Sequence, residues 1–240
     1  MKSPFLRQFP GKTRYQRVSE DDWNAPLPHR DIAGFGHILR LEADVRVWSP
    51  AGDLVSARKW PSRSYIRNFA RIFRNMFGQN VQLVDTAGNL RTVALNNTDF
   101  GNGGILIPGL VPFNGAQVGQ AQNPELSGAA MGIGNGVFVA NHQANDLVNR
   151  VGGIVSSRNN VRTSVQTTAT VTLEITTGIT NSQAASINVT EIALFMFVSQ
   201  LNAAPSSVPF ATMLAHDGIS ITPVAAGGVI APRYTMDFPI

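Results

Sequence analysis

Strict alternation of apolar and polar side chains is the feature that most constrains how this chain can fold. From residue 41 to residue 47 every second side chain is apolar, and the side chains between them are charged. The apolar set is Leu41, Ala43, Val45 and Val47. Because successive side chains of a β-strand point to opposite faces of the sheet, residues 39–47 are predicted to form a strand with one buried face. The turn-forming sequence Pro-Ala-Gly-Asp at 50–53 then predicts a hairpin, with 54–60 as its second strand.

The same type of pattern continues through the chain. Residues 81–90 repeat the hairpin sequence around a second turn, Ala-Gly-Asn-Leu. Apolar side chains alternate with threonines and other polar ones from 165 to 176, which predicts one long strand. Further strands are expected over 187–198 and 233–238, with 178–186 as a connection. Such strands with short to medium connections are typical of antiparallel neighbours, so the sequence predicts a mainly β protein built as an antiparallel β-sandwich.

Residues 63–77 have the period of a helix rather than of a strand. One face carries the apolar side chains Ile66, Phe69, Ala70, Phe73, Met76 and Phe77. Another face carries Arg63, Arg67, Arg71 and Arg74. This pattern predicts a single amphipathic helix whose aromatic face lies in the core. Since no acidic residue occurs between Arg58 and Gln82, we expect the four arginines to contact carboxylates of another chain, or phosphates.

The sequence predicts an N-terminal arm followed by one domain. Residues 1–36 contain prolines and glycines without any period, which indicates an extended N-terminal arm. Its aromatic residues are predicted to contact a neighbouring subunit, because isolated aromatic groups gain by burial: Phe5, Phe9, Tyr15 and Trp23. Residues 37–240 are predicted to form one β-rich domain with a long Gly-, Asn- and Pro-rich loop at about 96–136. At its end the sequence Gly-x-Gly-x-Gly, from Gly132 to Gly136, is interpreted as a tight turn or bulge that leads into a strand.

Composition excludes several classes of function. The chain has no cysteine, which excludes disulfides, thiolate nucleophiles and cysteine-ligated metals. Only 14% of the residues are charged, against about 25% on average, and this favours a surface covered by partners. Without a run of about 18 apolar residues or a signal-like N-terminus, we expect a protein that is neither membrane-bound nor exported. Residues 1–75 hold 14 Lys and Arg against 7 Asp and Glu, so nucleic acid stays open as a partner, although it is not favoured.

Residue types that carry catalysis do not form a recognised motif. The four histidines have no metal-binding spacing: His29, His37, His142 and His216. His216 is interpreted as a surface or interface residue, although Asp217 follows it. A hydrolase with two catalytic carboxylates stays possible, although nothing in the sequence singles out a pair. The C-terminal half has six acidic residues: Glu125, Asp146, Glu174, Glu191, Asp217 and Asp237. We therefore predict no enzyme, no cofactor and no metal site.

Several short motifs, taken in their common order, resemble a recurrent layout in virion structural proteins of tailed bacteriophages. The motifs are RSYIRNF at 63–69, GIGNGV at 132–137, NDL at 145–147, TEIALF at 190–195, MLAHD at 213–217 and YTMDF at 234–238. The chain departs from the family pattern at Asn135, Leu147, Ala193 and His216. The resemblance covers roughly residues 60–240 and brings no catalytic residues.

The resemblance implies a non-enzymatic virion protein that is made in the host cytoplasm. It would assemble as a symmetric oligomer in the head–tail (neck) or tail region, through its arm and loops. Its partners would be copies of itself and other virion proteins. Two alternatives are a capsid decoration (cement) protein and a β-sandwich module that binds host carbohydrate.

Overall fold

The protein is mainly β, as its sequence predicts. The computed structural model describes residues 3–9, 12–24, 40–62, 68–69, 71–72, 81–93, 128–141, 143–156, 161–167, 170–200 and 208–239. In this part of the chain no helix is long and apolar enough to cross a membrane.

The chain forms two compact units, and each is assembled from separate segments. Unit 1 contains Met1–Arg63, Asn160–Val189 and Ile221–Ile240. Unit 2 contains Ser64–Asn159 and Thr190–Ser220. The predicted boundary at residue 36 falls outside the described residues.

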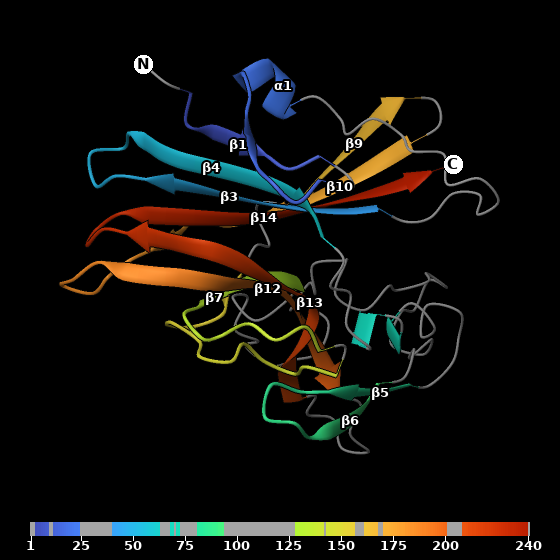
Figure 1. The fold of residues 1–240 in the computed structure, drawn as a ribbon. Helices are drawn as coiled ribbons and strands as arrows, with labels where there is room; N and C mark the ends of the chain where they lie inside the picture. Colours follow the sequence, from blue (N-terminus) through green and yellow to red (C-terminus); the bar gives the residue numbers. More distant parts are fainter. Residues whose placement is uncertain are drawn as a thin grey trace, which may run out of the picture. The chain divides into compact units, whose positions relative to one another are not determined.

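Unit 1 is built on an eight-stranded sheet with the order β2-β1-β4-β3-β14-β10-β9, in which β11 also pairs with β14. The strands are β1 (Phe5–Arg7), β2 (Gln16–Arg17), β3 (Arg40–Trp48), β4 (Leu54–Pro61), β9 (Val161–Thr167), β10 (Thr170–Thr176), β11 (Ile179–Thr180) and β14 (Val229–Pro239). The neighbours are antiparallel, as predicted, except that β1 runs parallel to β4. Figure 1 shows β14 between β3 and β10, inside the sheet.

The alternation in β3 and β14 places one set of apolar side chains in the core. Leu41, Ala43, Val45 and Val47 are buried, together with Tyr234 and Met236. The prediction of only one buried face was wrong, because the charged side chains of Glu42 and Asp44 are buried as well. Glu42 pairs with Lys59 at 2.8 Å, and Asp44 pairs with Arg233, which also contacts Glu174 at 3.0 Å. Burial is tolerated here because each carboxylate has a cationic partner.

Residues 165–176 do not form the single long strand that the alternation predicts. They form parts of β9 and β10, which pair antiparallel with Val171 opposite Val165. Alternation is the same in one long strand and in a hairpin, so the pattern cannot tell them apart. The two strands are separated in the sequence by Thr168 and Ala169. Neither is a residue that commonly forms turns, such as Gly, Pro, Asn or Asp, so the sequence gives no sign of a turn there.

The described part of residues 1–24 belongs to unit 1 and pairs with its sheet, whereas the sequence predicts an extended arm. Strand β1 pairs with β4, and a short helix, α1 (Glu20–Asn24), follows β2. The helix is capped by Ser19, whose hydroxyl accepts a hydrogen bond from the Asp22 N–H at 3.0 Å. Phe5 and Trp23 are buried in the chain's own core, against Ala57. These two aromatic residues therefore have partners within the chain.

Unit 2 contains most of a four-stranded sheet, with the order β13-β12-β7-β8. It also contains a separate two-stranded sheet, β5-β6. The strands are β7 (Gly128–Gly134), β8 (Val155–Ser156), β12 (Ile187–Gln200) and β13 (Val208–Val224), with the hairpin β5 (Val81–Val84) and β6 (Leu90–Val93). Both hairpins that the sequence predicts, and the strand at 187–198, are confirmed. Of the predicted helix at 63–77, residues 68–69 and 71–72 are helical, and the rest lies outside the described residues.

Strand β7 corrects the prediction of an uninterrupted loop at 96–136. Residues 128–134 pair with β12, with Ile133 opposite Ile192, and residues 135–141 are irregular. Gly132 is needed in this strand because a Cβ atom there would lie 2.8 Å from Phe195 Cε2 and 3.1 Å from Leu147 Cδ1. The glycine therefore permits close packing instead of breaking the strand.

Candidate functional site: a buried carboxylate beneath an exposed valine patch

The side chain of Glu191 is the centre of a buried polar cluster in the described part of unit 2. It extends from β12 and is fully buried, with 0% exposure. Its carboxylate accepts hydrogen bonds from the N–H groups of Gly136 (2.8 Å), Val148 (3.0 Å) and Asn149 (3.4 Å). His216 Nε2, from β13, lies 2.8 Å from Glu191 Oε2. An ionised carboxylate only accepts, so Nε2 carries the hydrogen of this bond.

The hydrogen bonds determine the charge state of Glu191. Burial raises its pKa, but the bonds from Val148, His216, Asn149 and Gly136 outweigh this, and the pKa lies below its usual value. Asp146 lies on the same segment as Val148, and burial raises its pKa in spite of a hydrogen bond from the Leu147 N–H. Glu191 is therefore an anionic anchor for two loops.

Gly134 and Gly136 allow these loops to approach the carboxylate. A Cβ atom at Gly136 would lie 2.5 Å from Glu191 Oε1 and 2.7 Å from Val148 Cβ. One at Gly134 would lie 2.9 Å from the same oxygen. Neither glycine has a positive φ, and β7 and β12 pair without a register shift at Gly134. The interpretation as a tight turn or bulge was wrong, because close approach to Glu191 is what requires the glycines.

His216 is buried within the chain, whereas the sequence suggests a surface or interface residue. It lies inside β13 and is 2% exposed, because Phe138 covers it with their rings edge to face and 4.8 Å apart. Its Nδ1 has no hydrogen-bond partner among the described residues. Both members of the Glu191–His216 pair are closed to solvent, so in this arrangement the pair acts as an internal anchor.

The two anchored loops expose three valines, which we call the valine patch: Val137, Val139 and Val148. Their exposed fractions are 81%, 65% and 59%. Gly136 and Val148 themselves donate their N–H groups to Glu191, so the anchor acts directly on the backbone that carries these side chains. Asn149 Nδ2 joins the loops by a 2.5 Å bond to Asn135 Oδ1. Exposed apolar side chains that lie together are typical of an interaction surface, which makes these three valines the candidate contact of this site.

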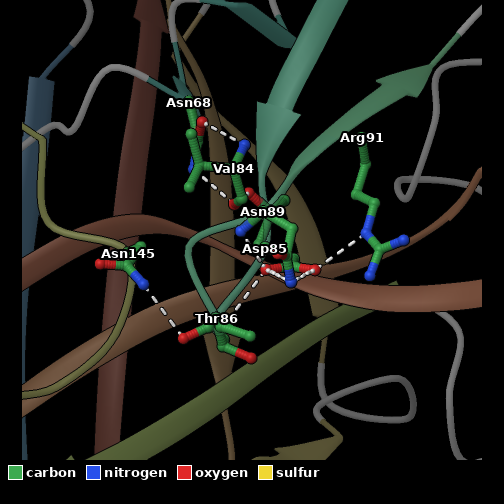
Figure 2. Close-up of polar contacts among 9 residues, drawn as sticks. Asn68, Val84, Asp85, Thr86, Asn89, Arg91 and Asn145 are labelled. Atoms are coloured by element: carbon green, nitrogen blue, oxygen red, sulfur yellow. Dashed lines mark hydrogen bonds and ion pairs between the residues drawn. The ribbon is translucent and has the colours of Figure 1, made fainter.

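A second polar cluster holds the turn between β5 and β6 (Figure 2). Asp85 Oδ1 accepts hydrogen bonds from the N–H groups of Ala87 (3.0 Å) and Asn89 (2.8 Å), and Oδ2 pairs with Arg91 at 2.9 Å. Burial raises the pKa of Asp85, but these bonds outweigh it and lower the pKa. Asn145 Nδ2 donates to the Thr86 carbonyl at 3.0 Å, as Figure 2 shows. This bond ties the turn to the segment that carries Val148.

Five of the eight residues predicted as subunit contacts are described, and they do not belong to the Glu191 cluster. Phe5 and Trp23 are buried, whereas Phe9, Tyr15 and Arg71 are partly buried. The side chains of Arg63, Arg67 and Arg74 lie outside the described residues. None of the five described ones is among the residues that hydrogen-bond to Glu191.

Sequence reasoning missed the cluster, although one signal was present. Glu191 and His216 are isolated polar residues within apolar runs, TEIALF and MLAHD. A polar side chain in such a run is either exposed on a strand or paired in the core, and only the fold decides between these alternatives.

Acidification is expected to remove the contribution of Glu191 to stability. Since its pKa is lowered in the folded chain, this contribution is present above the unfolded value near 4.5 and is lost as the pH falls through the folded value. Denaturation of the wild type and of Glu191→Gln from pH 7 to pH 3 would measure it. The stability difference should shrink below about pH 4.5. Asp85 and Asp146 are present in both the wild type and the variant, so their titration cancels in the comparison. A stability difference between the two proteins that does not change with pH would show that Glu191 is not the group responsible.

No protein-family model, no curated protein and no solved structure was found to match this chain.

Proposed function

We propose that this chain is a non-enzymatic structural protein of a tailed-bacteriophage virion. It assembles with copies of itself as a symmetric oligomer in the head–tail (neck) or tail region. The main support for the proposal is that three of the motifs that resemble the virion proteins come together at the carboxylate of Glu191. Glu191 belongs to TEIALF, Gly136 to GIGNGV and His216 to MLAHD.

The apolar side chains of these motifs also pack together. Leu147 of the NDL motif belongs to one buried cluster with Phe195 and Met213. Motifs separated by tens of residues thus form one packing unit, which supports the idea that their common order reflects a shared structural element. The β-sandwich arrangement is part of this proposal.

The valine patch is the proposed contact between copies. Burial of an exposed valine side chain contributes about 1.5–3 kcal/mol. Three such side chains contribute a useful share of the free energy that holds a subunit in an oligomer, and the Glu191 anchor fixes them before assembly. Binding then loses less conformational entropy than it would with free loops.

Replacing a valine of the patch by aspartate is expected to block assembly without unfolding the chain. Val137→Asp places a charge on a side chain that is 81% exposed, so the free subunit should tolerate it. In the oligomer the charge would be buried without a partner. Light scattering across a concentration series should show an oligomer for the wild type and a clear shift towards monomer for the variant.

Ile221→Asp is the matched control, because Ile221 is 64% exposed on β13 and belongs to neither the valine patch nor β4. It should leave the mass distribution unchanged. A monomeric wild type that binds glycans in a parallel screen would overturn the proposal in favour of the carbohydrate-binding alternative. A low-resolution map of the virion would separate a neck or tail position from capsid decoration.

A further inference from the structure

The N-terminal segment, defined as residues 3–24, carries a small core of its own. The rings of Phe5 and Trp23 are 5.4 Å apart, and Val18 packs against them. Main-chain bonds hold the segment together, from Val18 N–H to the Phe5 carbonyl at 3.1 Å and from Trp23 N–H to the Ser19 carbonyl at 3.0 Å. The segment thus has internal contacts of its own, independent of those to the rest of unit 1.

The segment is attached to the remainder of unit 1 mainly through one strand, β4. The parallel register sets Leu6 opposite Arg58, and main-chain bonds run from Ala57 N–H to the Pro4 carbonyl (3.1 Å) and from Gln8 N–H to the Lys59 carbonyl (2.8 Å). Ala57 and Leu54 of β4 complete the cluster around Phe5 and Trp23. Addition of a strand to a sheet edge uses main-chain groups, which β4 offers equally in every copy of the chain.

The connection from the segment to β3 is longer than this attachment needs. The segment contacts β4 near Ala57, whereas β3 begins beside the far end of β4, where Glu42 pairs with Pro61. At about 3.3 Å per residue this separation along the sheet is about 20 Å. Residues 25–39, which join the two, can span up to about 50 Å. Chain length therefore allows the segment to reach a β4 strand other than its own.

We infer that in the assembled protein the N-terminal segment docks on β4 of a second copy of this chain, and that the copies exchange their segments. This inference rests on the proposed function, because it requires assembled copies. The contacts are the same in both arrangements, so they do not oppose the exchange. In an oligomer a neighbouring β4 is held at high effective concentration, and the exchanged segments then link the subunits.

The lack of cysteine in this chain makes the exchange directly measurable. Paired strand positions satisfy the Cα separation of a disulfide, 4.4–6.8 Å. Leu6→Cys and Arg58→Cys are therefore introduced into separate full-length chains, which are unfolded, mixed, reassembled and oxidised. Exchange is expected to give a disulfide-linked band at twice the 25.8 kDa chain mass. Leu6→Cys mixed with Val55→Cys, out of register on β4, is the control and should give little of this band.

The double variant, with both cysteines in one chain, separates the outcomes. An oligomer in which this variant links only within single chains overturns the exchange and leaves the proposed function standing. A monomer that links within the chain overturns both. Absence of any link overturns the exchange as well, because it contradicts the register of β1 on β4.

A second measurement needs no substitution on β4. A photo-reactive amino acid at position 6 is cross-linked in oligomers reassembled from ¹⁵N-labelled and unlabelled chains. Cross-linked peptides that join one labelled and one unlabelled strand report exchange. Cross-linked peptides with uniform labelling only would overturn it.

Discussion

A chain that ends at Pro232 is expected to be insoluble or unfolded. The truncation removes most of β14, which pairs with β3 on one side and with β10 on the other. Tyr234 and Met236, at 0% and 4% exposure, leave the core, and each contributes about 1.5–3 kcal/mol. The ladder bonds to both neighbouring strands are lost as well. Together these losses rival the ~5–15 kcal/mol that stabilise a typical domain.

The same truncation also removes the cation that neutralises Asp44. Arg233 pairs with this carboxylate, which is 1% exposed and whose pKa burial raises. A buried carboxylate without its partner destabilises the fold further. Solubility and cooperative melting are the measurements, with tryptophan fluorescence as the probe, because Trp23, Trp48 and Trp60 all belong to unit 1.

Two milder changes serve as controls for the truncation. Removal of only Pro239 and Ile240 should preserve melting, because it affects the end of the strand. Met236→Ala should cost about 2–5 kcal/mol, whereas Thr235→Ala, at a partly exposed site, should cost much less. A soluble chain ending at Pro232 that melts cooperatively would show that β14 is dispensable.

The second large effect is expected for Glu191→Ala, which should destabilise unit 2 by about 3–5 kcal/mol. The change leaves the N–H groups of Gly136 and Val148, and the imidazole of His216, without their common acceptor. Glu191→Gln keeps an oxygen acceptor of the same length and should lose less. Since the tryptophans belong to unit 1, the readout is amide hydrogen exchange at Gly136 and Val148.

Glu174→Ala provides the matched control for this substitution. Its side chain is 28% exposed and pairs with Arg233 at 3.0 Å, so its removal should cost about 0–1 kcal/mol. Exchange at Gly136 and Val148 should not change in this control. Unchanged protection of both amides in Glu191→Ala would show that other contacts hold the two loops.

Strands were predictable where local alternation alone determines them. Residues 41–47 have this pattern, whereas 187–198 alternate only at their start and continue as an apolar run typical of a buried strand, and both are strands. Strand β13 was missed, because Gly218 and the polar pair His216-Asp217 interrupt its alternation. Gly218 is required there by Phe138, whose Cδ1 would lie 2.4 Å from an added Cβ atom.

The candidate site could not be predicted, because its contacts join residues distant in sequence. Glu191 was one of six acidic residues of the C-terminal half, and nothing local distinguishes it from Glu174, which is only partly buried. Its four donors come from around residues 136, 148 and 216. Burial and pairing are therefore properties of the fold, and the nearby glycines became informative only once their neighbours were known.

The central place of β14 has a consequence for biosynthesis. Strands β3 and β4 emerge from the ribosome early, but the strand that pairs with β3 on its other side is made last among the strands of this sheet. At ~5–20 residues per second, the chain between residues 61 and 229 takes roughly 8–35 s to synthesise. During this interval the apolar face of β3 lacks Tyr234 and Met236. Nascent chains should therefore be open to chaperone binding until β14 arrives, and unit 1 should complete its folding only afterwards.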